Sequence, residues 1–217
     1  MKMNLKNKQE QKKLNMEKLK KYFNNKNLFI FLCSLLLISI IVGILFYCYM
    51  NTNDKLTINK NIESYFQVKE SYNYLKDLKL NLLNNFGNNT IIWLLGISII
   101  GIILVIFLFF IESFSIGYSL AAIISNYKLK GIIGIFSYLF PSKIIYIFTL
   151  IILTYYSIRF SIDIIRHLIF KKEINFHEIF NKYLKILLFT TLLSILISIL
   201  EVFIDPLMIK LFTFFTK

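Results

Sequence analysis

The sequence contains few of the residues from which metal and redox sites are commonly built: two cysteines and two histidines. Cys33 and Cys48 lie fifteen positions apart in one apolar run, about 22 Å along a helix, which is too far for a disulfide. His167 and His177 lie in or beside a basic loop, and His177 has Glu178 as a neighbour without further ligands. We therefore expect no metal site and no cofactor, and we interpret both cysteines as apolar side chains.

Common catalytic motifs are also missing. The sequence has no H-E-x-x-H, no G-x-S-x-G, no phosphate-binding loop and no C-x-x-C, the patterns that mark several hydrolases, nucleotide-binding enzymes and redox proteins. We therefore predict that the protein is not an enzyme and has no catalytic residues. An intramembrane protease or transferase is the alternative that this absence leaves open.

Acidic residues are scarce, with 12 Asp and Glu against 25 Lys and Arg, for a formal net charge of +13. A hydrophobic content of 57% and a mean hydropathy of +0.64 exclude an ordinary soluble domain. The lysines are concentrated in the ends and loops around uncharged runs, as in membrane proteins. No groove-reading motif accompanies them, so we expect no nucleic-acid partner. The pattern predicts an all-α, polytopic helical bundle in the membrane.

The chain begins with a basic segment and a long apolar run. Residues 1–26 carry nine lysines against two glutamates, and such a segment before a first span is typical of a cytoplasmic N-terminus. We therefore interpret residues 1–27 as a cytoplasmic tail, which can also contact anionic lipid headgroups. Residues 28–50 carry no charge and form the first predicted transmembrane helix.

Residues 51–90 are predicted to form an extracytoplasmic amphipathic segment. Apolar residues recur there at helical steps: Ile62, Tyr65, Val68, Tyr72, Leu75, Leu78 and Leu82. One interpretation is a helix that packs flat on the spans or on the membrane surface. The other is a surface presented to a partner, with Tyr65, Tyr72 and Leu75 as the partner-facing residues.

Residues 91–217 are predicted to form a multi-span membrane domain. It opens with the apolar block Ile91 to Ser125, which is too long for one upright span and barely long enough for two. Gly96, Gly101 and Gly117 recur through this block. Small residues let helices approach closely in lipid, so we assign these glycines to helix packing.

Three further residues mark close packing or a break in the same domain. Gly131 and Gly134 lie in a second apolar run that ends at Pro141. Proline cannot donate the helical hydrogen bond and disfavours helix in the residue before it. We expect a break there, at the membrane face or in a re-entrant segment.

Two basic segments determine the predicted number of spans. The N-terminal tail and the loop at 166–185 should share the cytoplasmic side, which requires an even number of spans between them. The first helix, two spans from the central region and one at 143–165 make four, and a fifth begins at residue 186. The central block then folds as a hairpin, or as a span with a shortened partner. Alternatively, one long helix covers 91–120 and the next span covers 131–150.

Four ionisable residues fall within or near the apolar runs: Glu112, Arg159, Asp163 and Glu201. A charge in the bilayer is costly and usually has a partner or a function. Arg159 and Asp163 are four residues apart and can pair on one helix face. Glu112 meets Arg159 if the central block returns to the cytoplasmic face. An ion or proton relay is the alternative use of these charges.

Three short stretches resemble the stage II sporulation protein M family: Phe110–Tyr118, Lys130–Gly134 and Leu139–Pro141. The resemblance is best over residues 91–165. Members of that family often carry a histidine after the proline and an acidic residue shortly beyond, where this chain has Ser142 and Lys143. The resemblance implies a polytopic protein that holds extracytoplasmic cell-wall hydrolases at the septal membrane while the forespore is engulfed.

Two functions are therefore expected for a multi-pass protein of the cell membrane. The first is a non-catalytic scaffold of the cell envelope, whose partners are membrane lipid and other envelope proteins such as cell-wall hydrolases. The second is a small permease or the membrane subunit of a transporter, which the small-residue helices and the buried charges favour. Neither the partner nor any transported substrate follows from the sequence.

Overall fold

The computed structural model describes residues 25–66, 73–170 and 175–216, which form helices and turns without any strand. The helices are α2 (Asn25–Tyr49), α3 (Thr52–Phe66), α4 (Tyr74–Gly96), α5 (Gly101–Tyr127), the short 3-10 helix η1 (Lys128–Lys130), α6 (Gly131–Leu139), α7 (Ser142–Phe170), α8 (Phe176–Phe203) and α9 (Asp205–Thr216). The predicted all-α bundle is confirmed.

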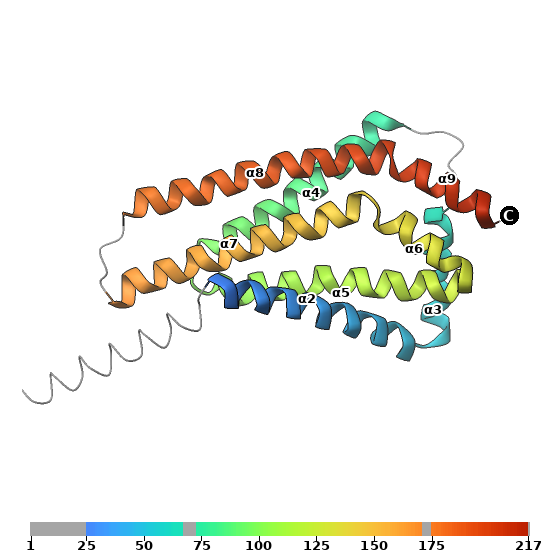
Figure 1. The fold of residues 1–217 in the computed structure, drawn as a ribbon, viewed down its shortest axis with the longest axis horizontal. Coiled ribbons are helices and arrows are strands. Elements are labelled where there is room, and N and C mark those ends of the chain that lie inside the picture. The colour runs from blue at the N-terminus through green and yellow to red at the C-terminus, as the bar shows by residue number, and fades with distance from the viewer. Residues whose placement is uncertain (1–24, 67–72, 171–174, 217) are drawn as a thin grey trace, which may run out of the picture.

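Five of these helices, α2, α4, α5, α7 and α8, are long and run side by side (Figure 1). Helix α2 packs on α5, α4 packs on α7 and α8, and α7 packs on α8. The start of α2, the α4–α5 turn, the end of α7 and the start of α8 lie at one end of the bundle (Figure 1). Helices α3, α6 and α9 lie at the opposite end, which we call the capped end.

Four helical stretches are long and apolar enough to cross a membrane: Lys26–Tyr49, Gly101–Leu139, Ser142–Leu168 and Phe176–Phe215. Their outward side chains are large and apolar, for example Leu37 on α2 and Leu192 on α8, both exposed. Exposed apolar side chains on parallel helices are what lipid contact requires. Helix α4 is more polar than these stretches, yet it lies among them.

The central block divides differently from the predicted hairpin. Its first residues complete α4, the chain turns at residues 97–100, and α5 then runs unbroken from Gly101 to Tyr127. The glycine makes the turn possible, because a Cβ on Gly101 would overlap the carbonyl of Leu95. The predicted break at Pro141 falls between α6 and α7. Residues 74–90 of the predicted extracytoplasmic segment therefore belong to a helix of the bundle.

Helices α2 and α5 cross in close contact at two glycines. A Cβ built on Gly117 would lie 2.7 Å from the Cα of Ile40, and one built on Gly43 would lie 2.9 Å from the backbone nitrogen of Tyr118. Such separations are shorter than van der Waals contact. The two backbones therefore touch directly, as small residues permit in membrane helices.

The shorter helices pack over the capped end. Gly131 and Gly134 of α6 bring that helix against Ile123 of α5, where a Cβ would lie 3.0 Å from an Ile123 atom in either case. Phe66 of α3 and Phe212 of α9 join the same cluster, with ring centroids 4.5 Å apart. The ends of α3, α6 and α9 are therefore fixed to α5 by apolar contacts.

Candidate functional site

Helix α4 is held in the bundle by a row of buried amides. Asn85 donates to the hydroxyl of Ser198 at 3.0 Å and to the carboxylate of Glu201 at 3.1 Å. Asn89, one turn further along α4, donates to the hydroxyl of Ser194 at 2.7 Å and to the carbonyl of Thr190 at 3.2 Å. Residues four apart share a helix face. Each amide thus meets a small polar residue of α8, and we call this row the α4–α8 polar seam.

The seam continues toward the α4–α5 turn through an aromatic pair. The Trp93 indole nitrogen donates to the carbonyl of Tyr183 at 3.3 Å, and the Tyr183 hydroxyl donates to the carbonyl of Trp93 at 2.7 Å. Gly96 lies next on α4, where a Cβ would lie 2.8 Å from the Cβ of Ser157. The glycine therefore lets α4, α7 and α8 meet at one point.

Glu112 lies half-buried between three helices, α4, α5 and α7. Its carboxylate accepts hydrogen bonds from the Tyr146 hydroxyl at 2.8 Å and from the Asn88 amide at 3.5 Å. The expected contact with Arg159 is not formed, because Arg159 lies about 20 Å further along α7 than Tyr146. Neutral hydrogen-bond donors, rather than a cation, satisfy this carboxylate.

The expected pair of Arg159 with Asp163 is also replaced by another. Asp163 pairs with Arg166 at 3.4 Å, and Arg159 donates to the Tyr155 hydroxyl at 3.3 Å. Both arrangements lie within one turn of α7, so the sequence spacing permitted either one. Both residues lie toward the α7–α8 connection, away from the capped end.

At the capped end, the seam ends in an ion pair. The Lys143 ammonium lies 3.1 Å from the carboxylate of Glu201, the same carboxylate that Asn85 contacts. Beside it, the Ser142 hydroxyl donates to Oδ2 of Asp205 at 2.6 Å. The first residues of α7 thus bind the end of α8 and the start of α9.

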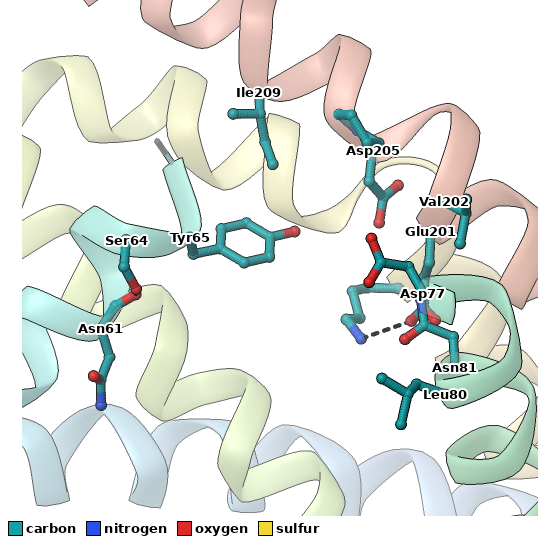
Figure 2. A pocket seen from close by; sticks show the side chains of 12 residues that line it. Asn61, Ser64, Tyr65, Asp77, Leu80, Asn81, Glu201, Val202, Asp205 and Ile209 are labelled. Carbon is teal, nitrogen blue, oxygen red and sulfur yellow. Dashed lines mark hydrogen bonds and ion pairs between the residues drawn. The ribbon is translucent and has the colours of Figure 1, made fainter. Parts of the chain in front are cut away.

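A pocket of about 550 Å³ opens over this ion pair, between α3, α4 and the α8–α9 junction (Figure 2). Its lining residues are Asn61, Ser64, Tyr65, Asp77, Leu80, Asn81, Lys143, Glu201, Val202, Asp205, Pro206 and Ile209. The Tyr65 hydroxyl points toward the carboxylates of Asp77 and Asp205 (Figure 2). Burial raises the pKa of Tyr65, and the Asp205 carboxylate raises it further, so this hydroxyl remains a proton donor. Among the pockets formed by the described residues, we take this one as the candidate functional site.

Two of the pocket residues, Tyr65 and Glu201, are among the candidate residues predicted from the sequence. Tyr65 and Glu201 were singled out, the first as partner-facing and the second as a membrane charge. Asp77, Lys143 and Asp205 were not, since each reads as a loop or helix-end charge. Their shared signal is a helix terminus: all three lie in the first turn of a helix. That signal becomes specific only when the three termini are known to meet.

The structure describes two of the three residues that the sequence predicts to face a partner. Leu75, in the first turn of α4, is 84% exposed, so it is free to contact another molecule. Tyr65 is 36% exposed, and its ring packs edge-on against Phe66 and Tyr138. Tyr72 lies outside the described residues.

No group of three or more His, Cys, Asp and Glu side chains with metal-binding geometry occurs in the described ranges. Searches of curated proteins and of solved structures gave no match. A family model described as stage II sporulation protein M matches residues 7–206, which is most of the chain. Together with four helical stretches able to cross a membrane, this match shows that the chain is a membrane protein of the stage II sporulation protein M family.

Proposed function

We propose that the protein is a non-catalytic, multi-pass scaffold of the cell membrane that holds other envelope proteins, such as cell-wall hydrolases, on its outer side. The observation that carries the proposal is the family match over residues 7–206. Polar groups between the helices support it, because the buried Asn85 and Asn89 and the half-buried Glu112 are used in contacts between helices. Such contacts stabilise a bundle and expose no reactive group.

The arrangement of the helices supports one orientation. Helix α2 begins at the same end at which α7 ends and α8 begins (Figure 1), and the sequence segments before α2 and between α7 and α8 are rich in lysine. Basic segments remain on the cytoplasmic side. With α4 counted as a span, α2, α4, α5, α7 and α8 cross five times. The capped end with its pocket then faces the outside.

This orientation is tested by cysteine labelling in a background that carries Cys33→Ala and Cys48→Ala. Asn53→Cys, at the start of α3, should react with a membrane-impermeant maleimide in intact cells, because the capped end faces out. Asn175→Cys, before α8, should react only after the cells are permeabilised. Labelling of Asn175→Cys in intact cells would show that the orientation is reversed.

The scaffold role is tested at the exposed residue Leu75. A large apolar side chain at the centre of an interface commonly contributes about 1–3 kcal/mol to binding. Leu75→Glu should therefore reduce crosslinked recovery of envelope partners at least about five-fold, while the protein accumulates normally. Partners are identified from the wild-type sample and then quantified in each variant.

Leu168→Glu is the matched control, because Leu168 is exposed at the opposite end of the bundle. It should leave partner recovery unchanged. If both variants recover every partner as the wild type does, the scaffold role at this surface is excluded. A permease instead predicts that solute uptake fails when Glu112 is neutralised in a protein that still folds.

A further inference from the structure

We propose that the pocket at the capped end binds a lysine or arginine side chain from an outer segment of a partner protein. This inference rests on the proposed scaffold function and adds the chemistry of the partner. It locates that contact between α3, α4 and the α8–α9 junction, beside the exposed Leu75 rather than at it.

The charge of the lining is the first argument. Three carboxylates face the pocket, Asp77, Glu201 and Asp205, against one ammonium from Lys143. That ammonium is already bound to Glu201 at 3.1 Å. Within the described ranges, Asp77 and Asp205 form no ion pair. The pocket therefore carries two carboxylates that a positively charged group would neutralise.

The second argument is an unsatisfied acceptor. The Asp205 side chain belongs to a residue that is 5% exposed, and its Oδ2 accepts from Ser142. Its Oδ1 is buried and has no donor among the described residues. Leaving a buried acceptor unpaired is destabilising, and more so for a charged one. An incoming N–H donor would supply the missing hydrogen bond, and the carboxylate points into the pocket to receive it (Figure 2).

The walls favour a long side chain. Leu80, Val202 and Ile209 line the pocket beside the carboxylates, so one wall is apolar and the adjacent surface is acidic. Lysine and arginine have this same division, with an apolar stem and a charged end. The volume of about 550 Å³ lies within the usual range of ligand sites and leaves room for the residues that flank such a side chain.

Two other ligands that carry a positive group, a metal ion and a zwitterionic lipid headgroup, fit the pocket less well. A metal ion is disfavoured because the carboxylates do not form a metal-binding group within the described ranges. A zwitterionic lipid headgroup would bring its phosphate toward Asp77 and Asp205, and Lys143 is engaged by Glu201. A basic side chain introduces no such negative charge.

The test is a titration of the full chain in phosphatidylcholine nanodiscs, followed by calorimetry. The probes are acetyl-Gly-Arg-Gly-amide and the same peptide with citrulline, which has nearly the shape of arginine without its charge. We expect the arginine peptide to bind at least ten-fold more tightly. The variant Asp77→Asn/Asp205→Asn should bind both peptides equally. Asp77→Asn alone should weaken binding of the arginine peptide, which serves if the double variant does not fold.

The matched control is Asp54→Asn/Glu63→Gln. It removes two exposed carboxylates of α3 at the same end of the bundle but outside the pocket, and it should preserve the preference for arginine. Equal binding of both peptides to the wild type would overturn the proposal, as would an equal loss in the control. Loss of arginine-peptide binding in nanodiscs that contain phosphatidylethanolamine would assign the pocket to a lipid amine instead. Loss of partner recovery in Leu75→Glu, with normal recovery in Leu168→Glu, would then still support the scaffold.

Discussion

Replacing Gly117 with valine should lower the free energy of unfolding by about 1–3 kcal/mol, the usual cost of forcing extra atoms into a filled core. The reason is the crossing of α2 and α5, where a Cβ on Gly117 would lie 2.7 Å from the Cα of Ile40. The obstacle is backbone, which cannot rotate away as a side chain can. The helices must separate, and they lose the contacts around Gly43 as well. Thermal unfolding of the purified protein in detergent measures the loss.

Gly87→Ala is the control for this prediction, because nothing lies within 4 Å of a Cβ at that position. Alanine is favoured over glycine inside a helix by about 1 kcal/mol, so this variant should be slightly more stable than the wild type. Two glycine substitutions in helices should thus have opposite signs. If Gly117→Val unfolds at the wild-type temperature, the close crossing of α2 and α5 does not exist in the protein.

The crossing of α2 and α5 was not predicted from the sequence. Gly117 lies among small residues, and that density indicated helix packing. Gly43, its counterpart on α2, lies in an ordinary apolar run, which gives no signal of helix packing. A glycine in such a run becomes informative only when the neighbouring helix is known. Which helices are neighbours depends on the tertiary fold, and no local pattern specifies it.

Helix α4 shows where local reasoning failed. The helical stripe from Ile62 to Leu82 predicts an amphipathic segment outside the membrane, packed flat on the spans or presented to a partner. The structure instead has α3 and α4 as separate helices, and it places α4 against α7 and α8. Asn85 and Asn89 are tolerated there because Ser194 and Ser198 of α8 accept their hydrogen bonds. These partners are more than one hundred residues away, beyond any periodicity argument.

The sequence predicts five spans; the described residues contain five long helices and four stretches long and apolar enough to cross a membrane. The prediction of five spans rests on the difference in lysine content between loops on the two sides of the membrane. That difference is a property of each whole loop, so it is insensitive to the exact residue at which a helix begins. The contacts at the candidate site depend more strongly on the exact position of each helix. Glu112 was assigned a cation and has a tyrosine and an asparagine instead, because a side chain's partner depends on helix rotation as well as depth.

Lys143→Met should destabilise the protein by about 1–3 kcal/mol, less than the cost of breaking a fully buried pair because both side chains are partly exposed, at 28% and 13%. The change leaves the Glu201 carboxylate with Asn85 as its remaining partner. Glu201→Gln should cost less, since its amide oxygen still accepts from Asn85. The freed ammonium of Lys143 can then reach water on its flexible stem.

The double variant Lys143→Met/Glu201→Gln separates this ion pair from packing alone. Removing both charges eliminates the unpaired carboxylate, so the double variant should be more stable than Lys143→Met. Unfolding temperatures of the four proteins in one detergent complete the cycle. Strictly additive losses would show that the two charges do not interact, and the attachment of α7 to the α8–α9 junction would then depend on the Ser142–Asp205 hydrogen bond rather than on this pair.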